Sequence, residues 1–188
     1  MTRLVDSGAL FAGWVGLGVA VVVAITFELI VAVQPLVFLL APLIGLLIGA
    51  YANVRASRWR PRWRVLANAG WVSLVCGLGL AVLYVTVRLV FVYGDTGAMP
   101  DGSRLACPTG PECGYLRWVE SGRAEMLAEQ GVTDAESFEQ AVLGGLAYGA
   151  VLLVVLNVGG GLVAGAGRAL TRASNEREAT QAARSSAM

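Results

Sequence analysis

The residues of this chain best placed to do chemistry are Cys107 and Cys113, which flank the segment Pro-Thr-Gly-Pro-Glu. Five residues rich in turn formers let the two thiols meet, so the spacing predicts a small disulfide-closed loop on an oxidising face. We interpret the bridge as a structural staple. The alternative is redox chemistry, because a strained and exposed disulfide is easily reduced. The third cysteine, Cys76, falls in an apolar run and is predicted to be inert.

A second candidate is a pair of opposite charges, Glu28 and Arg88, each inside an apolar run. Ionisable residues in membrane spans are costly and usually face a partner or water. Glu28 lies six to seven residues before the turn at Gln34-Pro35, and Arg88 lies six before Gly94. Both therefore sit about 9–10 Å below their helix ends. Equal depth predicts an intramembrane ion pair; separate snorkelling to the headgroups and a proton or ion relay are the alternatives.

Three asparagines, Asn53, Asn68 and Asn157, fall at similar depth in their apolar runs. They lie toward the side of the spans opposite to Glu28 and Arg88. This placement predicts an interhelical polar cluster, in which each amide hydrogen bond contributes about 0.6 kcal/mol. A polar pocket open to the cytoplasm is the alternative.

The segment 55–64 is the densest run of charge, with five arginines and two tryptophans. It is predicted to set topology, to anchor at the interface and to contact anionic lipid headgroups. Nucleic acid is not an expected partner, because a ten-residue loop pinned at both ends offers little surface. The predicted lipid-contact residues are Arg55, Arg58, Trp59, Arg60, Arg62, Trp63 and Arg64.

Four apolar runs must position these residues: about 8–33, 35–54, 65–93 and 140–167. Each reaches the ~20 residues that a helix needs to cross ~30 Å of hydrocarbon. The expected fold is an all-α integral membrane protein, a bundle of four transmembrane helices within a membrane domain over 1–167. The first run is too long for a signal-peptide core and is expected to stay as an anchor.

Charge is divided unequally between the two sides of these runs. Ten arginines and three carboxylates lie in the terminal segments and the 55–64 loop, whereas 94–139 holds three arginines and nine carboxylates. The positive-inside rule places both termini in the cytoplasm and 94–139 outside the cell membrane. Arginine without lysine, together with abundant Gly, Ala and Val, suggests a bacterial inner membrane.

Small residues recur at four-residue spacing on two of the predicted helices. In lipid, such faces allow close backbone approach. We interpret them as packing within the bundle, with a homo-oligomer or a larger membrane complex as the alternative. The helix-packing residues are Ala41, Gly45 and Gly49 in the second run and Gly145, Gly149, Gly161 and Gly165 in the fourth.

The segment 94–139, which we name the cap segment, is the only sizeable part outside the apolar runs. Residues 115–130 are predicted to form a short amphipathic helix that stops at Gly131. Thr133 and Glu136 match a capping box at the start of the last helix. The polar tail 168–188 is expected to become disordered after about one further turn.

Four spans with an outer cysteine pair between the third and the fourth resemble the bacterial quinone-linked membrane proteins that generate disulfides. That resemblance implies a second pair, Cys-x-x-Cys, near the outer end of the second span. This chain has Gln34-Pro35 in its first outer connection and no cysteine there. A membrane thiol–disulfide oxidoreductase is therefore kept as an alternative.

The sequence contains no histidine, which is the commonest general base and metal ligand, and it contains no lysine. No catalytic residues, metal site or cofactor are expected. We predict a non-enzymatic multi-pass protein, structural, accessory or self-associating. A transporter or channel component that uses Glu28 and Arg88 is a further alternative, although the two halves of the chain show no inverted repeat.

Overall fold

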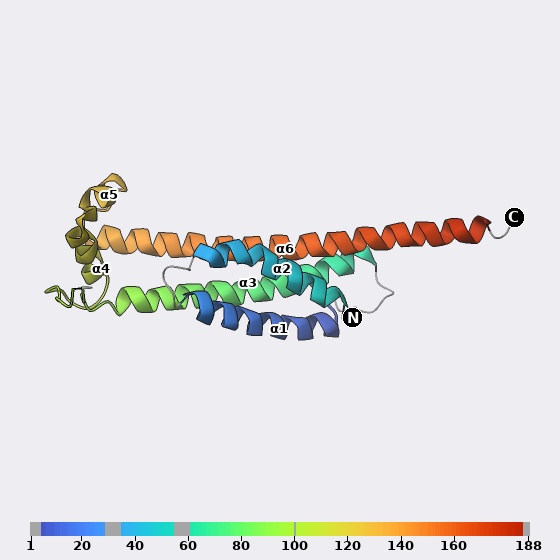
Figure 1. Cartoon of the computed structure of the whole chain (residues 1–188), viewed down its shortest axis with the longest axis horizontal. Helices are drawn as coiled ribbons and strands as arrows, with labels where there is room; N and C mark the ends of the chain where they lie inside the picture. The colour runs from blue at the N-terminus through green and yellow to red at the C-terminus, as the bar shows by residue number, and fades with distance from the viewer. Residues whose placement is uncertain (1–4, 29–34, 55–60, 100, 186–188) are drawn as a thin grey trace. The chain divides into compact units, whose positions relative to one another are not determined.

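The computed structural model describes residues 5–28, 35–54, 61–99 and 101–185, with side chains given in these ranges except at 27–28 and 172–185. In the described residues all regular structure is helical apart from one isolated bridge, Ala98 with Arg104. The elements are α1 (Ser7–Val23), η1 (Ala24–Glu28), α2 (Pro35–Val54), α3 (Arg62–Tyr93), α4 (Pro111–Trp118), η3 (Val119–Arg123), α5 (Ala124–Glu129) and α6 (Ala135–Ser185) (Figure 1).

Four described helical stretches are long and apolar enough to cross a membrane: Ser7–Thr26, Pro35–Val54, Arg62–Tyr93 and Ala135–Thr171. The predicted all-α, four-helix membrane architecture is thereby confirmed. The last two stretches contain 32 and 37 residues. At 1.5 Å per residue they exceed the ~30 Å hydrocarbon core, so both helices extend beyond it.

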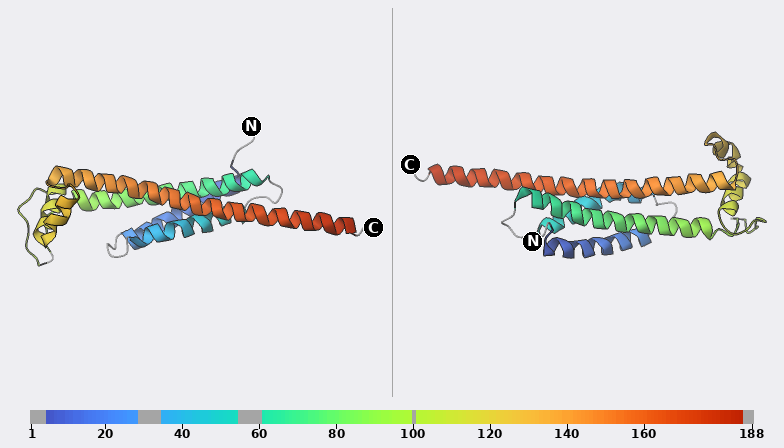
Figure 2. Two further views of the ribbon diagram at one scale, coloured as in Figure 1. Left: turned by 90° about the horizontal axis from the view of Figure 1, so that it is seen from above. Right: turned by 180° about the vertical axis from the view of Figure 1, so that it is seen from behind.

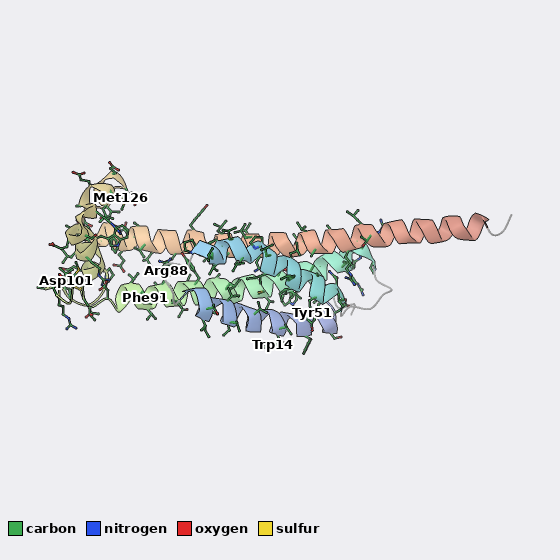
Figure 3. All side chains as sticks on the ribbon, in the orientation of Figure 1. Trp14, Tyr51, Arg88, Phe91, Asp101 and Met126 are labelled. Atoms are coloured by element: carbon green, nitrogen blue, oxygen red, sulfur yellow. A yellow bond between two sulfur atoms is a disulfide. The ribbon has the colours of Figure 1, made fainter. Side chains whose placement is uncertain are left out.

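Large apolar side chains cover the outside of these helices instead of being buried. Trp14 of α1, Leu39 of α2 and Tyr148 of α6 are each about 70% exposed, and Figure 3 shows Trp14 directed away from its helix. A water-soluble bundle would bury such residues, because exposed apolar area is costly in water. Lipid tails remove that cost, so the distribution agrees with a multi-pass membrane protein.

The chain forms two compact units, Met1–Ala81 with Leu152–Met188 (unit 1) and Val82–Val151 (unit 2). In unit 1, α1, α2 and parts of α3 and α6 run alongside one another in every view (Figures 1 and 2). The α1 face turned inward carries only alanine and glycine. Its close neighbours include Ile48 of α2 and Cys76 of α3, both of which approach Gly16.

Glycines allow α2, α3 and α6 to meet backbone to backbone in unit 1. A Cβ added at Gly45 would overlap the carbonyl oxygen of Asn157, and one at Gly49 would lie 2.8 Å from the Cα of Gly161. A Cβ at Gly161 would in turn overlap the hydroxyl of Ser73. These small-residue positions therefore lie at helix contacts inside the bundle. Ala41 and Gly165 are also buried, the latter against α3.

In unit 2, the structure differs from the single predicted helix over 115–130. Helix α4 begins earlier, at Pro111, and Gly122 has a φ of +76°, which separates α4 from α5. A proline at the first helical position needs no amide hydrogen bond, and glycine adopts positive φ without strain. The amphipathic pattern is therefore divided between two short helices.

The end of α5 follows the predicted stop. Gly131 has a φ of +76°, its N–H donates to the carbonyl of Ala128, and the N–H of Val132 donates to that of Leu127. This is a Schellman motif, in which Leu127 and Val132 also make the expected apolar contact. Phe138 of α6 completes the small core.

The start of α6 is capped one residue later than the sequence predicted. The N–H of Ser137 donates to Asp134 Oδ1 at 2.8 Å, and the N–H of Asp134 donates to Ser137 Oγ at 3.1 Å. Asp134 and Ser137 thus form the reciprocal pair assigned to Thr133 and Glu136, because both residue pairs have the required spacing. At its other end α6 continues to Ser185, beyond the single extra turn expected, since Ala, Arg, Glu and Gln favour helix.

Candidate functional site

The disulfide between Cys107 and Cys113 is present, with the two Cα atoms 5.4 Å apart. Cys113 is fully buried in the first turns of α4, and Cys107 is half-buried in the preceding loop. A Cβ at Gly97 would lie 2.8 Å from Cys107 Sγ, and its φ is +70°. Only glycine fits at this position, so the chain packs directly against the bridge at Gly97.

Asp95 organises the loop around that disulfide. Its Oδ1 accepts the N–H of Gly97 at 2.9 Å and pairs with Arg117 of α4. Its carbonyl accepts the N–H of Gly110 at 2.8 Å. The Asp95 side chain is only 10% exposed, so water has little access to the carboxylate of this ion pair. Asp95 therefore connects Gly97 and helix α4 through its carboxylate, and the disulfide loop at Gly110 through its backbone carbonyl.

Further polar contacts of unit 2 are structural. The hydroxyl of Tyr93 at the end of α3 donates to Glu139 of α6. The hydroxyl of Tyr115 donates to the carbonyl of Thr133 at 2.7 Å. Asp101 accepts both the N–H and the hydroxyl of Ser103. These bonds lower the pKa of the exposed Asp101 carboxyl below its usual range.

Arg88 of α3 lies in a cavity of about 360 Å³ within unit 2. The other lining residues include Tyr84 of α3, Trp118 of α4 and Val142 and Gly145 of α6. The guanidinium carbon is 5.7 Å from the centre of the Tyr84 ring, and Figure 3 shows Arg88 between α3 and α6. Tyr84 is one turn nearer the start of α3, which is the direction in which helical side chains lean.

The predicted partner of Arg88 cannot be placed, because the side chain of Glu28 lies outside the described residues. The Glu28–Arg88 ion pair therefore stays a prediction. Within the described part of the chain, the Nε of Arg88 is buried and has no hydrogen-bond partner.

The three buried asparagines have different environments. The amide of Asn68 donates to Asp6 Oδ2 at 2.6 Å and accepts the N–H of Asp6 at 3.3 Å, which ties α3 to the start of α1. Asn53 donates to the carbonyl of Gly49 in its own helix at 3.1 Å.

Asn157 is fully buried at the contact of α2, α3 and α6. Neither its amide oxygen nor its amide nitrogen has a hydrogen bond of normal geometry to any described residue. The Cys76 thiol lies within interaction range, but a thiol bonds weakly. Nearby, the hydroxyl of Ser73 donates to the carbonyl of Gly45 at 3.1 Å. The structure thus links α2 and α3 through a serine that sequence reasoning missed, because serine is unremarkable in an apolar run.

Part of the predicted lipid-contact segment can be placed. Arg55, Arg58, Trp59 and Arg60 lie outside the described residues. Arg62 and Trp63 at the start of α3 are exposed. The guanidinium carbon of Arg64 is 5.3 Å from the Trp63 ring centre.

No group of three or more Cys, Asp or Glu side chains in the described residues is arranged to hold a metal ion. Sequence reasoning missed the cavity around Arg88 and the Asp95–Arg117 pair. The four-residue spacing of Tyr84, Arg88 and Val92 could have indicated one wall of the cavity. Its other walls come from α4 and α6, and no local signal connects them.

Comparison with protein-family models, with curated proteins and with solved structures found no match to this chain.

Proposed function

We propose that this chain is a non-enzymatic subunit of a larger assembly in a bacterial inner membrane. In that assembly it holds its disulfide-closed cap segment at the membrane surface. One observation carries the proposal: the reactive groups of the cap segment are occupied by structural contacts. The cysteines are joined to each other, Asp95 is held by Arg117, and Glu139 is held by Tyr93. What remains exposed is an acidic surface, which suits contact with a partner.

The orientation that we propose has both termini in the cytoplasm and the cap segment outside. The unequal distribution of arginine supports it through the positive-inside rule. The Cys107–Cys113 bridge supports it independently, because disulfides persist in oxidising compartments such as the bacterial periplasm.

Neither alternative function gains a specific observation. A disulfide exchange relay needs a second thiol pair, whereas the remaining cysteine, Cys76, is buried in α3 and belongs to unit 1. A transport path between α2, α3 and α6 is closed off, because backbone atoms of these helices touch there.

Blue-native electrophoresis of gently solubilised native membranes tests the proposal. We expect the chain to migrate in a complex well above its own 19.6 kDa. The variant in which Cys107 and Cys113 are both replaced by serine, kept at low temperature, should migrate in the same complex. A single species near 20 kDa after mild solubilisation would contradict an accessory role.

Thiol alkylation of intact cells separates the accessory role from redox chemistry. A structural bridge should stay closed in growing cells and form no mixed disulfide. Cys107 or Cys113 trapped in a mixed disulfide with another protein would favour the oxidoreductase instead.

A further inference from the structure

The cavity around Arg88 combines one fixed positive charge with apolar walls. Its volume of about 360 Å³ falls in the range of small-molecule sites, roughly 300–1,000 Å³. Among the described residues, Arg88 is the only charged one in its lining. Tyr84 of α3, Trp118 of α4 and Val142 of α6 supply aromatic and aliphatic surface. Gly145 of α6 leaves open space, because a Cβ added there would meet no atom within 4 Å.

The Nε–H of the Arg88 guanidinium has no acceptor among the described residues of unit 2, and the nitrogen is buried. Arginine stays protonated in proteins, so the charge cannot be removed by loss of a proton. The Tyr84 ring offers a cation–π contact, but a ring face does not satisfy an N–H as an oxyanion does.

The carboxylates of unit 2 are committed elsewhere. Asp95 pairs with Arg117 and Glu139 accepts the hydroxyl of Tyr93. The remaining seven are exposed on the cap segment, and no carboxylate of a described side chain lines the cavity. An anion that neutralises Arg88 within unit 2 would therefore have to be a ligand.

The position of the cavity indicates an amphiphilic ligand. Arg88 lies five residues before the end of α3 at Tyr93, which is about 8 Å along the helix axis. The adjoining parts of α3 and α6 belong to stretches apolar enough to cross a membrane. An anionic headgroup near the helix end and an alkyl chain along the apolar wall would satisfy both parts of the cavity. We propose that this cavity binds one anionic phospholipid, with its phosphate on the Arg88 guanidinium.

Native mass spectrometry of the full chain in mild detergent, titrated with phosphatidylglycerol or phosphatidylcholine, tests the proposal. We expect one phosphatidylglycerol per chain, held more tightly than phosphatidylcholine. Arg88→Gln should weaken phosphatidylglycerol binding by about tenfold or more, because a hydrogen-bonded charge is lost. The matched control is Arg104→Gln, which removes the same charge from an exposed position of the same unit and should leave binding unchanged.

A second variant protects the test against misfolding of Arg88→Gln. Gly145→Leu retains the arginine and favours helix, but fills the open space in the cavity. It should weaken phosphatidylglycerol binding as strongly. Equal binding of both lipids, or equal binding by Arg88→Gln and Arg104→Gln, would overturn the proposal. Phosphatidylglycerol binding that appears only in Glu28→Gln would also overturn it, because Glu28 would then hold the guanidinium in the native chain. Displacement of every bound lipid by palmitate alone would overturn it too.

Discussion

Two buried asparagines illustrate how the same residue type contributes differently to the stability of the bundle. Asn68 exchanges two hydrogen bonds with Asp6, whereas Asn157 has none of normal geometry in the described residues. We expect Asn68→Leu to lower the free energy of unfolding by about 1–3 kcal/mol, because it removes both hydrogen bonds between Asn68 and Asp6. Asn157→Leu keeps the number and branching of the side-chain heavy atoms and removes an unsatisfied amide, so it should be neutral or stabilising. Thermal unfolding in detergent compares them; equal losses would contradict this assignment.

Asp95 is the residue on which the disulfide loop depends most. Asp95→Ala removes the acceptor for Gly97 and the partner of Arg117, and Gly97 packs on Cys107. Local opening should then expose the bridge, and its reduction by a mild reductant should accelerate by about tenfold. Alkylation mass shift measures the rate. Asp101→Ala is the control, since Asp101 bonds only within its own turn. Equal rates for the two variants would show that Asp95 does not shield the disulfide.

Among the elements, α2 and α6 meet backbone to backbone, and glycine makes this contact possible. Gly45→Ala places a Cβ on the backbone of Asn157, which should cost about 1–3 kcal/mol of stability through overpacking. Gly159→Ala is the matched control on α6. Nothing lies within 4 Å of its added Cβ, so the better helix propensity of alanine should make it neutral or slightly stabilising. Thermal unfolding distinguishes them. A destabilised Gly159→Ala would instead indicate that this face contacts a partner helix.

The beginning of α6 should respond to acid. Hydrogen bonds from Ser137 lower the pKa of the exposed Asp134 carboxyl below its usual 3.8. A lowered native pKa means that the stabilisation is complete above pH 3.8 and is lost as the pH falls through the native value. The protection of the Ser137 amide, measured against its intrinsic exchange rate at each pH, should therefore fall in acid. Asp134→Asn keeps an N-cap acceptor that does not titrate, so its exchange should lack this acid response. An identical response in both proteins would assign the effect to another group.

The four long helices, the disulfide and the stop at Gly131 could be predicted from the sequence, whereas the break between α4 and α5 and the cavity could not. A span in lipid must satisfy all its backbone hydrogen bonds internally, so a long apolar run leaves helix as the only choice. Gly122 has no such constraint: glycine can continue a helix or adopt positive φ, and here it separates α4 from α5. The cavity depends on Trp118 and Gly145 reaching the same space as Arg88. That proximity is tertiary, and hydrophobic periodicity does not encode it.

For the whole molecule, charge and disulfide chemistry independently support the orientation proposed above. Along the sequence, arginine is concentrated in the terminal segments and the 55–64 loop, and the bridged cysteines lie in the cap segment. We therefore expect an impermeant maleimide to label Cys107 and Cys113 on intact cells after reduction, and to leave the buried Cys76 unlabelled. A protease added outside should cut the cap segment and spare a tag placed after Met188.

The converse experiment identifies the cause of the orientation. Replacing the five arginines of 55–64 with glutamine removes the positive charge of the segment that joins the second and third spans. If the positive-inside rule sets the topology, part of the population should invert, and the cap thiols should become inaccessible to the impermeant reagent. Five neutral substitutions in the exposed cap carboxylates are the control, because acidic residues contribute little to topology. Inversion by the acidic variant alone would place the determinant in the cap segment, where acidic charge or a partner holds it outside.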